Sequence, residues 1–189
     1  MRPLHDDVAE ILLTETQTAK RLDELAATLR REYAGKELTL VGVLTGSVVF
    51  VADLLRRLPV PLRLDYLGVA SYHGGTRSTG ELQVTKALQL DVRDRHVLVV
   101  DDILDTGQTL VKVCAMIRQL GPRELKTCVF LEKNVPHHQN VRADFVAFQI
   151  PDKFVAGYGL DYQERYRNLP YVATLKPAVI AAPVPPPAG

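Results

Sequence analysis

Three aspartates lie within five positions of one another, directly after the apolar run 96–100. They are Asp101, Asp102 and Asp105, and a helix is expected to begin shortly after them, over 107–120. The first turn of that helix contains Thr106, Gly107, Gln108 and Thr109. Backbone N–H groups at the start of a helix bind anions, glycine lets the backbone approach a ligand closely, and threonine hydroxyls add donors. We therefore predict that a phosphate binds to residues 105–109.

The two adjacent acids, Asp101 and Asp102, require a different partner. Carboxylates accept hydrogen bonds and repel anions, so they suit vicinal hydroxyls or a hydrated Mg²⁺. A ligand that offers a phosphate beside a diol is a 5-phosphorylated ribose. A strand end and a helix cap explain a lone aspartate pair equally well. Three acids this close repel one another, however, and the whole segment favours a ligand site.

The elements that would position these residues alternate between strands and helices. Strands are expected over 38–44, 62–70, 96–100 and 125–131, helices over 48–58 and 107–120, and a hairpin return over 84–90. A capping box of Thr14 and Gln17 predicts the start of a further amphipathic helix that ends near Tyr33. This order predicts an α/β fold with a mainly parallel central sheet flanked by helices. Ligands bind such sheets at the carboxyl ends of the strands.

Short apolar runs after residue 144 are expected to join the N-terminal segment in a small hood over that edge. We place a single domain at 1–176, with its core at about 36–143 and the hood at about 1–15 and 144–176. Residues 177–189 contain five of the twelve prolines and are expected to form a disordered tail.

Composition limits the possible partners and location. The chain has 189 residues and a formal charge of +1, which disfavours a nucleic-acid partner. Cys114 and Cys128 have no metal-type spacing and are expected to be buried free thiols in a reducing compartment. The charge-free run 38–52 is too short to span a bilayer, and the N-terminal residues do not resemble a signal peptide. A cytoplasmic protein without a membrane partner is expected.

Residues 97–109 resemble the phosphoribosyl-diphosphate signature of the type I phosphoribosyltransferases. Further segments are similar to the hypoxanthine(-guanine) phosphoribosyltransferases: residues 43–47, 71–72, 78–81, 150–162 and 166–170. The resemblance runs from about residue 8 to residue 177. It implies a Mg²⁺-dependent purine salvage enzyme, a homodimer or homotetramer. Such an enzyme transfers 5-phosphoribose from phosphoribosyl diphosphate to N9 of hypoxanthine or guanine, giving IMP or GMP and pyrophosphate.

The resemblance also assigns roles to residues. It implies phosphoribosyl diphosphate binding by Leu44, Thr45, Gly46, Ser71, Tyr72, Asp101, Asp102, Asp105, Thr106, Gly107, Gln108, Thr109 and Arg167. It implies purine binding by Lys133, Phe154, Val155 and Asp161, and metal binding by Asp101, Asp102 and Asp161. Asp105 would be the catalytic acid/base at purine N7, and Lys133 would contact the 6-oxo group, which favours hypoxanthine and guanine over adenine.

Three further expectations concern the loops. Residues 44 and 45 would be joined by the cis peptide bond that is common in the family, and Ser71 and Tyr72 would begin a lid. Many relatives have a lysine or arginine where this chain has Thr45, so a contact made by that cation is absent here. Taken alone, Asp105 also fits a helix cap, Lys133 a strand end, and Phe154 a core position.

Two other functions are compatible with a phosphoribosyl-diphosphate signature. A regulator that senses phosphoribosyl diphosphate and binds RNA or DNA would not need Lys133, Phe154 and the lid. A pyrimidine or adenine transferase would not be expected to have Lys133 and the segment 151–155. Both are less consistent with the sequence than a purine salvage transferase.

Overall fold

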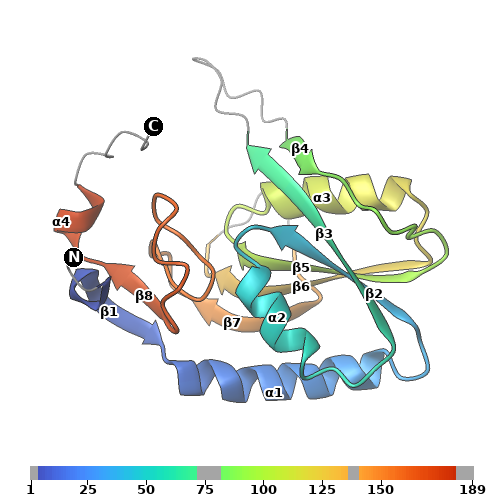
Figure 1. The fold of residues 1–189 in the computed structure, drawn as a ribbon, viewed down its shortest axis with the longest axis horizontal. Coiled ribbons are helices and arrows are strands. Elements are labelled where there is room, and N and C mark those ends of the chain that lie inside the picture. The colour runs from blue at the N-terminus through green and yellow to red at the C-terminus, as the bar shows by residue number, and fades with distance from the viewer. Residues whose placement is uncertain (1–3, 72–81, 136–140, 182–189) are drawn as a thin grey trace.

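The computed structural model describes residues 4–71, 82–135 and 141–181, which form a central sheet with helices on both faces and a small hood (Figure 1). The expected α/β class is confirmed. The elements are η1 (Leu4–Asp7), β1 (Val8–Leu13), α1 (Glu15–Glu32), β2 (Leu38–Leu44), α2 (Val48–Leu55), β3 (Leu62–Ser71), β4 (Leu82–Lys86), β5 (His96–Leu104), α3 (Gln108–Gln119), β6 (Glu124–Lys133), β7 (Phe145–Ile150), β8 (Val172–Leu175) and α4 (Pro177–Ile180).

The central sheet has six strands in the order β4-β3-β2-β5-β6-β7. Strand β4 is antiparallel to β3, and the other neighbours are parallel. From β2 the chain crosses through α2 to β3 on one side, and from β5 it crosses through α3 to β6 on the other side. The direction of winding therefore reverses between β2 and β5, which is where open α/β sheets form a ligand crevice.

Helix α1 begins as its capping box predicts. The Thr14 hydroxyl accepts a hydrogen bond from the Gln17 backbone N–H at 3.3 Å, and the Gln17 side-chain oxygen accepts one from the Thr14 N–H at 2.9 Å. These two bonds satisfy donors that a helix start otherwise leaves without partners. The buried face of the helix then packs on the sheet through Leu22, Leu25 and Leu29.

Alternation along the strands divides the core between the two faces of the sheet. Leu38, Leu40 and Phe130 face α1 and α2, whereas Val41 and Val99 face α3. The first face contains an aromatic group in which the Phe130 ring centroid lies 5.3 Å from Phe50, 5.7 Å from Phe148 and 4.6 Å from Tyr158. Tyr158 comes from the hood segment, so this group joins the hood to the sheet.

The hood is built from both ends of the chain. Strands β1 and β8 pair antiparallel in a separate two-stranded sheet, and the Lys176 N–H donates to the Asp7 carbonyl at 2.9 Å. The Tyr158 hydroxyl donates to Asp53 at 2.6 Å, which ties the hood to α2. Figure 1 shows the hood beside the end of the sheet at which β2 and β6 finish.

Two expectations about the C-terminal part are wrong. Residues 145–150 do not belong to the hood, because β7 pairs parallel with β6 as the sixth strand of the central sheet. Residues 177–180 are not disordered, because they form the short helix α4. Pro177 occupies its first turn, where proline fits well, and the Tyr162 hydroxyl donates to the Ile180 carbonyl at 2.7 Å. Residues 182–189 lie outside the described part of the chain.

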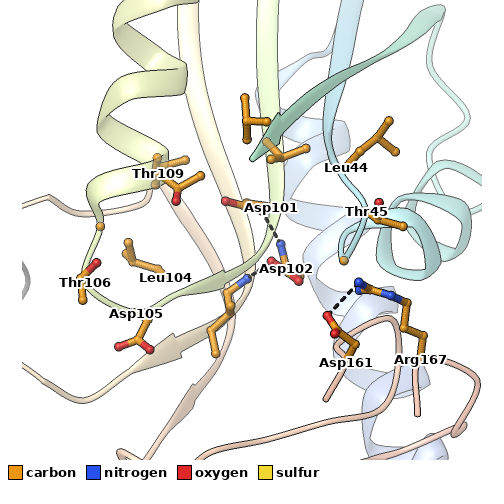
Figure 2. A pocket seen from close by; sticks show the side chains of 16 residues that line it. Leu44, Thr45, Asp101, Asp102, Leu104, Asp105, Thr106, Thr109, Asp161 and Arg167 are labelled. Atoms are coloured by element: carbon orange, nitrogen blue, oxygen red, sulfur yellow. Dashed lines mark hydrogen bonds and ion pairs between the residues drawn. The ribbon is translucent and has the colours of Figure 1, made fainter. Parts of the chain in front are cut away.

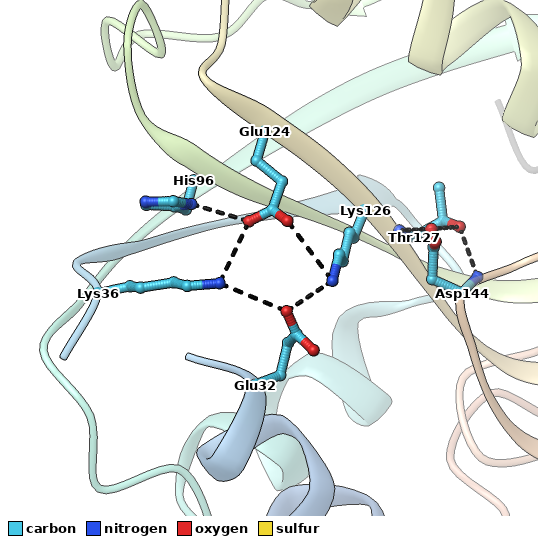
Figure 3. A network of polar contacts seen from close by, with 7 residues as sticks. All are labelled: Glu32, Lys36, His96, Glu124, Lys126, Thr127 and Asp144. Atoms are coloured by element: carbon cyan, nitrogen blue, oxygen red, sulfur yellow. Dashed lines mark hydrogen bonds and ion pairs between the residues drawn. The ribbon is translucent and has the colours of Figure 1, made fainter. Parts of the chain in front are cut away.

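A charged network lies at the amino-terminal ends of β5 and β6, at the end of the sheet away from the hood (Figure 3). Glu32, at the end of α1, lies 2.6 Å from Lys126 and 3.4 Å from Lys36. Glu124 lies 3.5 Å from Lys126 and 2.8 Å from the Nδ1 atom of His96. The hydrogen bond from Lys126 outweighs the effect of burial and lowers the pKa of Glu32. The network thus holds the end of α1 to the strand starts.

Cys114 and Cys128 are both buried free thiols, as expected. Burial raises the pKa of Cys114 to about 11 and raises that of Cys128 further, so both remain protonated at neutral pH. Within the described ranges, no helix combines the length and apolar character that a membrane crossing requires.

Candidate active site

A cavity of about 320 Å³ opens at the carboxyl edge of the sheet, between β2 and β5. It brings together most of the predicted site residues (Figure 2). Its lining comprises Val43, Leu44, Thr45, Gly46, Val69, Asp101, Asp102, Ile103, Leu104, Asp105, Thr106, Gly107, Thr109, Leu110, Asp161 and Arg167. The cavity therefore lies where the winding of the sheet reverses.

The acidic pair lies within β5, two residues before the strand ends at Leu104. Asp101 is 6% exposed, and its Oδ1 atom accepts a hydrogen bond from the Asp102 N–H at 3.0 Å. Burial raises the pKa of Asp101 well above its usual value, and the neighbouring Asp102 charge raises it further. Burial also raises the pKa of Asp102, whose Oδ1 atom accepts from the Ile103 N–H at 2.8 Å. Two close carboxylates in this position favour a bound cation or hydroxyl donors.

The predicted phosphate loop joins β5 to α3. Gly107 is the residue before α3 and has φ of +84°, a left-handed conformation that costs a residue with a side chain. A Cβ atom at this position would also lie 3.3 Å from the side chain of Val141. The first N–H groups of α3 have no acceptor within the helix, so they are available to an anion in the cavity.

A second loop, over residues 44–47, lines the cavity and lies against Asp102. The Leu44–Thr45 peptide bond is cis, as the resemblance implies. The buried Ser47 hydroxyl donates to the Val43 carbonyl at 2.6 Å, which fixes the turn before α2. A Cβ atom added to Gly46 would collide with the Asp102 carboxylate. This loop can therefore lie against the acids only because residue 46 has no side chain.

The hood contributes Asp161 and Arg167 to the cavity, and their side chains form an ion pair at 2.7 Å. Arg167 also donates to the Gly159 carbonyl at 2.8 Å. Gly159 has φ of +101°, and a Cβ atom there would collide with the Gly46 carbonyl. The hood loop and the 44–47 loop thus touch through backbone atoms. Sequence reasoning did not identify Gly159, although its position next to Tyr158 and two residues after Gly157 was a signal of an unusual loop.

Lys133 lies at the end of β6, beside the cavity. Its Nζ atom is 2.8 Å from Asp105 Oδ2 and 3.2 Å from Asp152 Oδ1, and its side chain is 12% exposed. Burial alone would lower the pKa of Lys133, but the two carboxylates outweigh it and raise the pKa. The ammonium is therefore charged and stands next to the expected acid/base residue. Asp152 was not among the predicted site residues.

The other predicted residues vary in their relation to the cavity. Phe154 is 49% exposed, and its ring makes an edge-to-face contact with Tyr162 at 5.4 Å between centroids, so it offers a face to a ligand. Val155 is buried in the main core, and Gln108 is exposed but does not line the cavity. Ser71 ends β3. Tyr72 and the rest of the expected lid lie outside the described residues.

The acids of the cavity offer the oxygen donors that a magnesium ion accepts. No group of three or more acidic, histidine or cysteine side chains within the described ranges could hold a metal by itself. Mg²⁺ commonly uses one or two carboxylates together with substrate phosphates and water rather than a complete protein cage. The oxygen donors of Asp101, Asp102 and Asp161 suit this partial coordination.

Comparison with known proteins identifies the family. The family model described as the phosphoribosyl transferase domain matches residues 8–163. The chain belongs to the phosphoribosyltransferase family. A hypoxanthine-guanine phosphoribosyltransferase of Staphylococcus aureus is 44% identical over 176 residues, which cover 93% of this chain and 98% of the relative. The resemblance inferred from the motifs is thereby confirmed.

Solved structures of phosphoribosyltransferases share the fold. A hypoxanthine phosphoribosyltransferase of Staphylococcus aureus superposes with a TM-score of 0.90 and 43% identity, covering 95% of this chain and 97% of that chain. The Trypanosoma cruzi hypoxanthine phosphoribosyltransferase, a mutant complexed with the product IMP, superposes with a TM-score of 0.88 and 35% identity, covering 95% and 96%. These values extend the family assignment over nearly the whole chain.

Proposed function

We propose that this phosphoribosyltransferase transfers 5-phosphoribose from phosphoribosyl diphosphate to N9 of hypoxanthine or guanine, releasing pyrophosphate. One observation supports the choice of base above all. The Lys133 ammonium and the Asp105 carboxylate are adjacent, 2.8 Å apart. A donor beside an acceptor matches the 6-oxo and N7–H groups on one edge of a 6-oxopurine, whereas adenine would present an amino group to the ammonium.

The sugar and its phosphates would use the two loops and the acidic pair. The 5-phosphate would bind residues 105–109 at the start of α3, and the ribose hydroxyls would donate to Asp101 and Asp102. The diphosphate would lie between residues 44–46 and Arg167, whose guanidinium suits phosphate oxygens. Support comes from the fact that all these residues except Gln108 line one cavity.

In the reaction, the bond from C1′ to pyrophosphate breaks and the bond from C1′ to purine N9 forms. Asp105 would accept the proton from N7 as N9 attacks, while Lys133 would donate to the 6-oxo oxygen. Phe154, whose ring is half exposed, would stack on the base, and Val155 would meet its edge through backbone atoms. Lys133 and Phe154 together would orient the purine ring so that N9 points towards C1′ of the sugar.

Magnesium would be held by Asp101, Asp102 and Asp161 together with the substrate, and it would neutralise diphosphate charge. The proposal is supported by the fact that all three carboxylates line the same cavity. We also expect the enzyme to assemble as a homodimer or homotetramer, which light scattering on the purified protein would measure.

The experiment is incubation of the protein with phosphoribosyl diphosphate and Mg²⁺, separately with hypoxanthine, guanine, xanthine and adenine. Formation of IMP and GMP with equal amounts of pyrophosphate is expected, without AMP. Absence of product from all three 6-oxopurines, or AMP as the main product, would refute the proposal.

A further inference from the structure

Asp152 contacts the proposed purine-binding lysine from the hood side. Its Oδ1 atom lies 3.2 Å from Lys133 Nζ, and Asp105 Oδ2 lies 2.8 Å from the same nitrogen. The two acids come from different parts of the chain, Asp105 from the loop after β5 and Asp152 from the turn after β7. The Asp152 side chain is 66% exposed, whereas the Lys133 side chain is 12% exposed.

The position of the ammonium depends on both carboxylates. An ammonium group has three N–H donors, and these two contacts use two of them. Asp105 must also accept the purine N7 proton, so its contact with Lys133 competes with its proposed role. With Asp152 in place, Lys133 is attracted from two directions. Without the Asp152 charge, the lysine would be drawn towards Asp105 alone.

The turn around Asp152 is fixed well enough to hold this contact. The Asn134 N–H donates to the Ile150 carbonyl at 2.8 Å, which joins the ends of β6 and β7 directly before the turn. The Lys153 N–H donates to the Pro151 carbonyl at 2.8 Å, and Lys153 Nζ forms an ion pair with Glu10 at 2.7 Å. Asp152 is therefore anchored both to the sheet and to the hood.

We propose that Asp152 is a positioning residue that holds the Lys133 ammonium at the place of the purine 6-oxo group and so strengthens selection for 6-oxopurines. This inference rests on the proposed function. Asp152 does not touch the reacting atoms in this scheme, because it acts only through Lys133. Its removal should therefore weaken binding of ligands that carry a 6-oxo group and leave other ligands unchanged.

The test compares two nucleotides that share the ribose 5-phosphate anchor, IMP and purine riboside 5′-monophosphate, which lacks the oxygen at C6. Their dissociation constants are measured by calorimetry for the wild type and for Asp152→Asn. The variant should raise the dissociation constant of IMP about three- to fivefold, as for one partly exposed ion pair, and change that of the other nucleotide less than about twofold. Equal changes for both nucleotides, or no change for IMP, would overturn the proposal.

Lys153→Gln is the matched control, because it removes the neighbouring hood ion pair with Glu10 and leaves Lys133 with both carboxylates. It should leave both dissociation constants unchanged. If it reproduces the Asp152→Asn pattern, the effect comes from hood docking and the proposal fails. Turnover of hypoxanthine by the wild type is measured in the same series. If the wild type does not turn over hypoxanthine, the proposed function is refuted. If the wild type is active but Asp152→Asn changes the dissociation constants of both nucleotides equally, only the inference is refuted.

Discussion

Asp65 provides a quantitative test of the forces that hold the base of the β3–β4 hairpin. Its side chain is 8% exposed, and it accepts hydrogen bonds from Lys86 Nζ at 2.9 Å and from the N–H groups of Tyr66, Gln89 and Leu90 at 2.7, 2.6 and 2.9 Å. Burial by itself raises the pKa of Asp65, but these donors outweigh it and lower the pKa from 3.8 to about 2.

The shift gives the size and the pH range of the stabilisation. A pKa lower in the folded than in the unfolded chain stabilises the fold wherever the group is ionised. The fall in pKa from 3.8 to about 2 corresponds to about 2.5 kcal/mol of stabilisation above pH 5. The contribution declines as the pH falls from about 4 towards 2, and about half of it remains at pH 3. Asp65→Asn should therefore lower the free energy of unfolding by about 2.5 kcal/mol at pH 7.

Urea denaturation followed by circular dichroism, at one protein concentration, measures this difference. The variant and the wild type are compared at pH 7 and at pH 3, so that other carboxyl groups, which titrate in both proteins, cancel. The gap in unfolding free energy should shrink by about half at pH 3. A gap that is the same at both pH values would show that the hydrogen bonds rather than the charge of Asp65 cause the loss. A gap below about 0.5 kcal/mol at pH 7 would refute the reasoning entirely.

Three further predictions concern the active site. Asp105→Asn should lower kcat with hypoxanthine at least about 100-fold, because an amide cannot accept the N7 proton. The dissociation constant of phosphoribosyl diphosphate should change little. Steady-state kinetics measure the first quantity and calorimetry the second. Gly46→Ala should raise KM for phosphoribosyl diphosphate about tenfold or more, because its Cβ would collide with Asp102, whereas KM for hypoxanthine should change less. Removal of Mg²⁺ with EDTA should abolish calorimetric binding of the diphosphate substrate, and unchanged affinity would contradict the proposed role of Asp101 and Asp102.

Local patterns in the sequence were sufficient to predict the elements that depend on neighbouring residues. The capping box of Thr14 and Gln17 marks the start of α1 correctly, because its hydrogen bonds join residues three positions apart. The apolar run before Asp101 predicts β5 and places the acids at its carboxyl end. The parallel order of β2, β5 and β6 then follows from the alternation with helices.

Features that depend on residues far apart in the chain could not be predicted in this way. The apolar pattern of 145–150 indicates a strand but cannot say which sheet it joins, and only packing against β6 decides it. The contact of Lys133 with Asp152 spans 19 positions, and the approach of Gly159 to Gly46 spans over 100. The resemblance supplied most of the site residues, and it did not supply these two contacts.

The pairing of β1 with β8 has a consequence for the order in which the protein becomes competent during synthesis. Translation delivers β1 first and its partner strand about 160 residues later, so β1 has no partner until residues 172–175 leave the ribosome. The central sheet, with the acidic pair and the phosphate loop, is complete once β7 is made. A nascent chain with about 150 residues outside the ribosome would therefore have the sugar half of the site but neither Asp161 nor Arg167. Catalytic competence is thus acquired last, when the two ends of the chain meet.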